Sequence, residues 1–83
     1  MTMTERGDDY AADIRFGEWL RSQRVRVGLS LEESAKLAMI TVERLKGLEM
    51  GLSGKGITRS EATRLGTAYK LEVHDIIERA ERL

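Results

Sequence analysis

The chain has 83 residues, enough for one small domain, and it contains no cysteine and one histidine, so a disulfide framework and a thiolate metal site are excluded. It has no run of about 18 apolar residues and no signal-peptide pattern, which excludes a membrane span and predicts a cytoplasmic protein. Proline is absent and charged residues make up 34% of the chain, which favours short helices, while the formal net charge is zero.

The N-terminal third of the chain is predicted to be an arm followed by a helix. Residues 1–12 are polar and lack a sustained apolar period, so they are expected to form a flexible arm ahead of a domain over residues 13–83. From Ile14 to Val27, apolar side chains recur at helical spacing and predict a first helix, which Gly28 ends.

Two short helices are expected next, with a sharp turn between them. Ser30 and Glu33 form a capping box, in which the serine hydroxyl accepts from the Glu33 amide and the Glu33 carboxylate accepts from the Ser30 amide. Thr41 caps the following helix, and Gly51 ends it. Only residues 38–40 separate the two helices, which is too few for anything but a sharp turn. This arrangement is typical of a helix-turn-helix, in which the second helix lies in the major groove of DNA. An ordinary helical hairpin that binds no DNA has the same arrangement.

The last two predicted helices follow a glycine-containing loop over residues 52–56. Thr58 and Glu61 form a second capping box, which opens a helix that continues to about Tyr69. A final helix begins near Glu72 and carries apolar residues at spacings of three or four, namely Val73, Ile76, Ile77, Ala80 and Leu83. The sequence therefore predicts an all-α fold of five short helices with tight connections.

Charge is unevenly distributed along the chain. Residues 1–13 carry four acidic and one basic side chain, and residues 72–83 carry four acidic and two basic ones. Residues 14–71 carry eleven basic and six acidic side chains. A basic middle segment is compatible with a polyanionic partner, and equally with ordinary solvated helix faces.

Several short motifs occur in order: Phe16-Gly17-Glu18-Trp19-Leu20-Arg21, Arg24, Gly28-Leu29-Ser30-Leu31-Glu32-Glu33-Ser34-Ala35, Ile40-Thr41, Leu45, Leu48, Glu49, Gly51, Leu65-Gly66-Thr67-Ala68-Tyr69-Lys70-Leu71 and Val73-His74-Asp75-Ile76-Ile77. With these motifs at this spacing, the chain resembles the Cro/lambda-repressor helix-turn-helix family, also called the XRE family. The resemblance implies a compact, lambda-repressor-like domain that binds double-stranded DNA. It also implies a structural ion pair between Arg24 and Glu49, which ties the first helix to the end of the third.

Candidate DNA contacts lie on the two central helices and the loop after them. The base-contact candidates are Val42, Glu43 and Lys46. Val42 can touch a thymine methyl group, and Glu43 can accept a hydrogen bond from cytosine N4. The phosphate-contact candidates are helix N-termini or basic side chains, and they are Ser30, Thr41, Arg44 and Lys55.

Three positions depart from the members of the family that read DNA. Leu31 and Gly47 stand where such members often carry Gln and a base-reading side chain, and Glu43 repels phosphate. These departures favour a rival interpretation, in which the chain keeps the fold, binds DNA weakly or not at all, and engages a protein partner. An antitoxin, an adaptor or an inhibitor of another regulator would be such a module.

The function predicted first is a sequence-specific transcription regulator, in the sense of a repressor, that binds a short palindromic operator as a homodimer. No enzyme activity is expected, because nothing orders Ser34, His74 and Asp75 into a catalytic triad. No cofactor is expected, and no metal either, since the chain has no cysteine and a single histidine. The candidate dimer interface is Ala80 and Leu83, which extend the apolar stripe of the last helix past the part that the domain can cover. The alternative is a frayed C-terminal turn.

Overall fold

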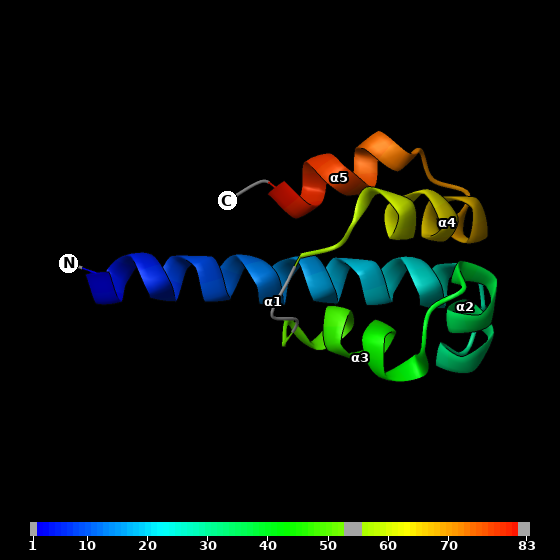
Figure 1. Cartoon of the computed structure of the whole chain (residues 1–83), viewed down its shortest axis with the longest axis horizontal. Coiled ribbons are helices and arrows are strands. Elements are labelled where there is room, and N and C mark those ends of the chain that lie inside the picture. The colour runs from blue at the N-terminus through cyan, green and yellow to red at the C-terminus, as the bar shows by residue number, and fades with distance from the viewer. Residues whose placement is uncertain (1, 53–55, 82–83) are drawn as a thin grey trace.

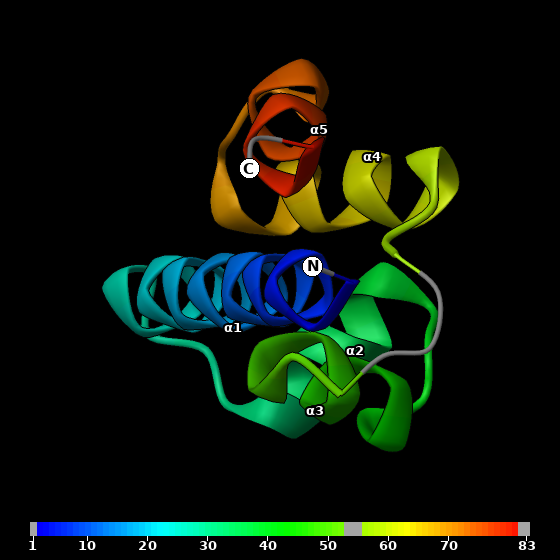
Figure 2. The ribbon, with the colours of Figure 1, turned by 90° about the vertical axis from the view of Figure 1, so that its left-hand side faces the viewer.

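Five helices make up the described part of the chain, which in this computed structural model is residues 2–52 and 56–81, with side chains described from residue 13 onward. They are α1 (Thr2–Arg26), α2 (Leu31–Ala38), α3 (Val42–Met50), α4 (Arg59–Tyr69) and α5 (Val73–Glu81). Figure 1 shows the long α1 in the middle, with α2 and α3 on one side and α4 and α5 on the other, and Figure 2 looks along α1. These residues include no strand, so the predicted all-α fold of five helices is confirmed.

The first helix is longer than the sequence indicated. α1 begins at Thr2, well before the predicted start near Ile14. Apolar spacing marks a helix where a buried face recurs, whereas an existing helix also propagates into polar sequence until something such as proline stops it. The prediction of the helix start was therefore wrong, and the role of residues 1–12 as a flexible arm stays a prediction. Among the described residues, no helix combines the length and apolar character that a membrane crossing requires.

The local signals that start the short helices act as the sequence predicted. At the start of α2, the Glu33 amide donates to the Ser30 hydroxyl at 3.0 Å and the Ser30 amide donates to the Glu33 carboxylate at 2.9 Å. The same reciprocal pair joins Thr58 and Glu61 at the start of α4, at 3.1 and 2.9 Å. The boundaries of these helices therefore follow from side chains within one turn of each start.

The turn between α2 and α3 is held in place from two directions. Met39 ends α2 with a φ of 59°, in the left-handed region that costs a residue with a Cβ about 1–2 kcal/mol. From α4, the Arg64 guanidinium donates to the carbonyl of Ala38, the last residue of α2. This contact satisfies a carbonyl that a helix end leaves without an intrahelical partner, and it links the turn to α4.

One core joins all five helices, and it consists of Phe16, Leu20, Ala35, Ala38, Leu45, Leu48, Ala62, Leu65, Tyr69 and Ile76. α1 and α3 lie in close contact at Gly17, where an added Cβ would lie 2.3 Å from the backbone oxygen of Glu49. Only a residue without a side chain allows this approach, so Gly17 sets how deeply α3 sits against α1.

α5 packs back onto α1 through an aromatic side chain. The Trp19 ring is half-buried, with its centre 5.9 Å from that of Phe16. From α5, the guanidinium carbon of Arg79 lies 4.7 Å from the centre of the Trp19 ring, a distance suited to a cation–π contact.

Candidate nucleic-acid interface

Two of the three predicted base-contact residues lie on the exposed side of α3. Glu43 and Lys46 are exposed, while Val42 is half-buried and packs against the core. Gly47 lies one turn after Glu43, and an added Cβ there would meet nothing within 4 Å. The structure therefore places Glu43 and Lys46 on one accessible face, with open space where Gly47 lacks a side chain, whereas Val42 is partly covered by the core.

The two helix N-termini proposed as phosphate sites are exposed, but their caps are already in use. The Thr41 hydroxyl accepts from the Arg44 amide at 3.0 Å, and the Ser30 hydroxyl accepts from the Glu33 amide. The first turn of α2 also carries two carboxylates, those of Glu32 and Glu33, whereas the first turn of α3 carries one, that of Glu43. Electrostatics therefore favour the Thr41 end over the Ser30 end as a place for a phosphate.

Arg24 and Glu49 join α1 to the end of α3. The guanidinium donates to both carboxylate oxygens, from Nε at 2.7 Å and from Nη2 at 3.0 Å, and Nη1 donates to the carbonyl of Leu29 at 3.0 Å. The side chains of the pair are 11% and 5% exposed, so it lies largely out of water. The hydrogen bonds from Arg24 to Glu49 raise the pKa of Arg24, against the opposing effect of its burial.

Arg44, predicted as a phosphate contact, is held within the domain. Its Nε and Nη2 atoms donate to the two carboxylate oxygens of Glu61 at 2.8 and 2.9 Å, and Nη2 also donates to the carbonyl of Gly56 at 3.1 Å. The hydrogen bonds from Arg44 lower the pKa of Glu61, and so does the amide of Thr58, while burial opposes both. Sequence reasoning missed this pair, because a capping box gives no sign of which helix packs beside it.

Two solved structures resemble this arrangement. The restriction-modification controller protein C.AhdI from Aeromonas hydrophila is 30% identical, with a TM-score of 0.72 over 83% of this chain and 97% of that one. The clp gene regulator ClgR from Corynebacterium glutamicum is 26% identical, with a TM-score of 0.69 over 83% of this chain and 71% of that one. The chain belongs to the helix-turn-helix regulators. No family model and no curated protein sequence matches it.

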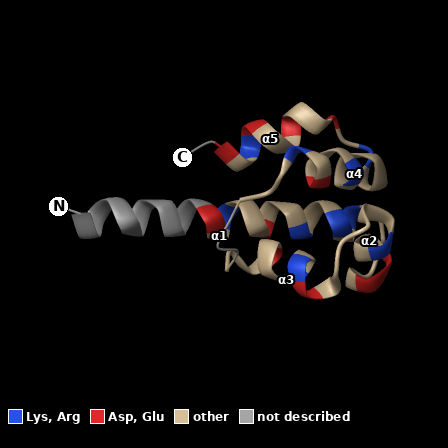
Figure 3. Cartoon of the chain, viewed as in Figure 1, with Lys and Arg blue, Asp and Glu red and all other residues tan. Residues whose placement is uncertain are grey.

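Much of the basic charge of this helix-turn-helix regulator is used inside the domain. Besides Arg24 and Arg44, the Arg64 guanidinium binds the end of α2, and Arg26 donates to the carbonyl of Tyr69 at the end of α4 at 2.7 Å. Figure 3 shows basic and acidic residues interspersed along α3, α4 and α5. The excess of basic residues over 14–71 therefore overstates the positive surface that a DNA backbone could meet.

Apart from Arg26, which is exposed but bound to the end of α4, the exposed basic side chains of the described part of this segment are Arg15, Arg21, Lys36, Lys46, Arg59 and Lys70. Arg59 follows the capping residue Thr58, so it lies at the N-terminus of α4. Arg44 binds the same end of α4 through Glu61. That position makes Arg59 a further candidate phosphate contact, which sequence reasoning missed. Lys55 lies outside the described residues.

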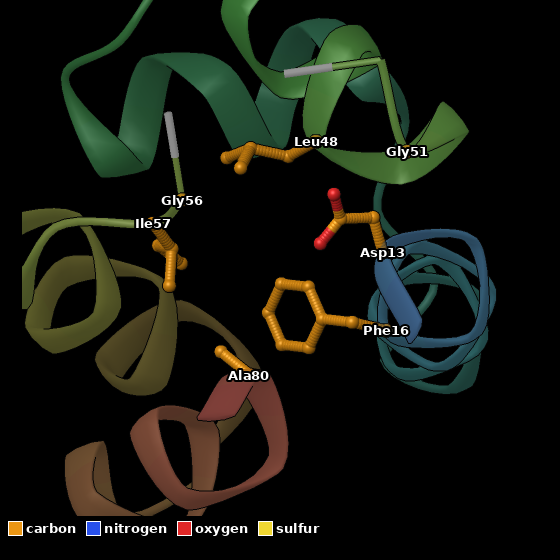
Figure 4. Close-up of a pocket in the computed structure, with 7 residues that line it drawn as sticks. All are labelled: Asp13, Phe16, Leu48, Gly51, Gly56, Ile57 and Ala80. Atoms are coloured by element: carbon orange, nitrogen blue, oxygen red, sulfur yellow. The ribbon is translucent and has the colours of Figure 1, made fainter. Parts of the chain in front are cut away.

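Ala80, predicted at a dimer interface, is half-buried against the domain's own core. It lines a cavity of about 100 Å³ together with Asp13, Phe16, Leu48, Gly51, Gly56 and Ile57. Figure 4 shows Ala80 of α5 beside the ring of Phe16, which belongs to α1. The domain's own core therefore covers part of Ala80, contrary to the expectation from the sequence, and its place in a dimer interface stays a prediction. Leu83 lies outside the described residues.

Three side chains on α5 could in principle approach one cation. The ligand atoms of His74, Asp75 and Glu78 all lie within 4.8 Å of one another, and all three residues are exposed. Exposed groups of this kind are common on helix surfaces, and this cluster gives no basis for a metal centre.

Proposed function

We propose that this helix-turn-helix regulator binds double-stranded DNA with the exposed face of α3, as a member of the Cro/lambda-repressor (XRE) branch. The observation that carries the proposal is the placement of α3. Its N-terminus and its outer face are accessible, while its inner face is fixed by Leu45 and Leu48 in the core. A helix that is rigidly supported on one side and open on the other can enter a major groove as a unit.

The contacts divide by chemistry. Lys46, which the sequence predicted as a base contact, and Arg59 are exposed cations that can approach phosphates. Lys55 is a further candidate from the loop. Val42 and Glu43, in the first turn of α3, would discriminate between bases. Arg44 is removed from this set, because its guanidinium is held by Glu61.

A salt titration with a random-sequence duplex tests DNA binding. The affinity of the wild type should fall steeply with salt, and Lys46→Gln should reduce the slope of log affinity against log salt by about one. Lys46→Glu should abolish binding while the helical circular dichroism is unchanged. Arg21→Glu, which makes the same charge change on the exposed side of α1, serves as the control and should retain most of the affinity. Unchanged binding by Lys46→Glu would contradict the proposed interface.

The finer proposal is a homodimer that occupies a short palindromic operator in the cytoplasm and represses by occlusion, with no enzymatic step. A two-fold dimer would present two α3 helices to half-sites about one DNA turn apart. The support for this is Leu83, which continues the apolar spacing of α5 in the sequence. The described members of that stripe, Val73, Ile76, Ile77 and Ala80, pack against the domain's own core and do not add to it.

Sedimentation at micromolar concentration tests the dimer. Leu83→Asp should yield monomers with an unchanged melting temperature. Ala80→Asp should instead lower the melting temperature, because it places a carboxylate beside Phe16 in the domain's own cavity. A monomeric wild type, or a dimer that tolerates Leu83→Asp, would exclude α5 as the interface.

The second candidate function is a protein-interaction module. Leu37 and Met39 are 56% and 77% exposed and, with Thr67 and Ala68 of α4, line an apolar groove beside the turn. An exposed apolar surface of this kind is typical of protein contacts, although nothing in the structure identifies an occupant. A wild type that shows no salt-dependent binding to duplex DNA would favour this second function.

A further inference from the structure

Arg44 projects from the first turn of α3, next to the side chains that would read bases. It follows Glu43 directly and lies two residues before Lys46. Although it is placed where a DNA backbone would come near, only 26% of its side chain is exposed, and its guanidinium forms a two-pronged pair with Glu61. Such paired, charge-assisted hydrogen bonds are among the strongest that side chains form.

The Glu61 side chain is also held by the capping box of its own helix, independently of Arg44. As the third residue of α4, it accepts from the Thr58 amide at 2.9 Å, while its own amide donates to the Thr58 hydroxyl. Its side chain is 12% exposed. The carboxylate is therefore a preorganised acceptor, and a phosphate would have to displace it in order to bind Arg44.

An arginine without this partner would act differently on DNA. A cation on the reading helix that can reach a phosphate contributes to every duplex, whatever its sequence, through counterion release. Such a contact raises affinity for bulk DNA and for an operator alike, and so adds nothing to discrimination between them. Holding the guanidinium on Glu61 removes that contact and leaves base reading to the other side chains of α3.

We propose that Glu61 is a specificity-determining residue, which holds Arg44 away from the DNA backbone and so limits binding to non-operator DNA. The same pair positions α3 against the N-terminus of α4 and, through the carbonyl of Gly56, fixes the end of the loop between them. This inference rests on the proposed DNA binding by α3.

Glu61→Gln tests the inference with little damage to the fold. A glutamine at this position of a capping box can still accept from the Thr58 amide, so the start of α4 is preserved. The substitution removes the charge that holds Arg44. Glu33→Gln is the matched control, since it makes the same change in the capping box of α2, where no arginine of the described part of the chain pairs with the carboxylate.

The probe is a duplex of random sequence, and the readout is the salt dependence of its affinity. Glu61→Gln should steepen the slope of log affinity against log salt by about one relative to wild type. Glu33→Gln should change the slope less. The gain should disappear in the double variant Glu61→Gln/Arg44→Gln, and Arg44→Gln alone should leave the wild-type slope almost unchanged.

The outcomes separate this inference from the proposed function. A wild type that binds, together with a Glu61→Gln protein whose slope matches that of Glu33→Gln, overturns the role of Glu61 alone. So does a loss of slope in the single Arg44→Gln variant, which would show that Arg44 already contacts DNA. A wild type that does not bind, with binding gained in Glu61→Gln through Arg44, supports the inference and contradicts the proposed function. Absence of binding by both proteins overturns both.

Discussion

An arginine–glutamate pair holds α3 at each end, but the two pairs lie in different surroundings. At its C-terminal end Glu49 meets Arg24 of α1, with side chains 11% and 5% exposed. Toward its N-terminal end Arg44 meets Glu61 of α4, with side chains 26% and 12% exposed. The geometry of the hydrogen bonds is nearly the same, so the difference lies in how much water surrounds the charges.

That difference assigns the two pairs different roles. Loss of a partner leaves a largely buried charge uncompensated at the first pair, which is costly, whereas water can solvate the remaining charge more easily at the second. The Arg24–Glu49 pair therefore contributes mainly to stability. The Arg44–Glu61 pair lies closer to solvent and to the reading face, where a change can alter binding while the fold survives.

Arg24→Ala is expected to have the largest effect on stability. It leaves the Glu49 carboxylate buried without a partner and removes a donor to the carbonyl of Leu29, at a cost of about 3–5 kcal/mol in the fully buried limit. Chemical denaturation measures the loss of unfolding free energy. Arg44→Ala is the matched comparison and should cost less, because its pair is more exposed.

A double-mutant cycle checks that the loss comes from the pair. Arg24→Ala and Glu49→Gln should together cost clearly less than the sum of their separate effects, since either one alone breaks the same interaction. Additive losses would mean that Arg24 acts through Leu29 or through packing, and would remove the basis for comparing the two pairs.

Gly17→Ala is expected to disturb the same end of α3 through packing alone. An added Cβ would lie 2.3 Å from the backbone oxygen of Glu49 and 2.6 Å from that of Leu48, so α1 and α3 must move apart. Overpacking of this kind typically costs about 1–3 kcal/mol, and backbone atoms cannot swing aside as side chains do.

Gly47→Ala is the control, because Gly47 lies on the open side of α3. Its Cβ would meet nothing within 4 Å, and alanine stabilises a helix interior by up to about 1 kcal/mol relative to glycine. Thermal melts should therefore move in opposite directions for the two variants. If both lowered the melting temperature equally, the close approach of α1 and α3 at Gly17 would be wrong.

Local signals explain how much of this fold could be predicted. The capping boxes at Ser30 and Thr58 and the glycine after α3 act within a few residues, so the sequence contains the whole interaction. Tertiary contacts are different. The sequence shows Glu61 as a cap, but the arrival of Arg44 beside it depends on how α3 packs against α4.

The candidate site was predictable to a smaller extent for the same reason. Spacing on one helix placed Val42, Glu43 and Lys46 on a common face, which is a local property of α3. Whether a basic side chain is available to DNA depends on its neighbours in space, and the pair that Arg44 forms with Glu61 could not be predicted from the spacing. The partial burial of Ala80 was not predictable either, because the core against which it packs includes residues from distant parts of the chain, such as Phe16.

The acid dependence of the second pair gives the smallest expected effect. Hydrogen bonds from Arg44, and then from the Thr58 amide, hold the pKa of Glu61 in the folded protein below its usual range. Because the folded pKa is the lower one, the stabilisation from this carboxylate is fully present above the ordinary glutamate pKa of about 4.3. It is lost as the pH falls through the lowered folded value.

Denaturation of wild type and Glu61→Gln across this acidic range measures the effect. The difference in unfolding free energy between the two proteins should be constant near neutral pH and shrink as the pH falls below about 4.3. In an Arg44→Gln background the largest cause of the pKa shift is absent, so the same comparison should show a weaker pH dependence. Parallel stability curves for wild type and Glu61→Gln at low pH would show that Arg44 does not stabilise the charged carboxylate. The Arg44–Glu61 pair would then contribute nothing measurable to the free energy of unfolding. Only the Arg24–Glu49 pair would stabilise the fold.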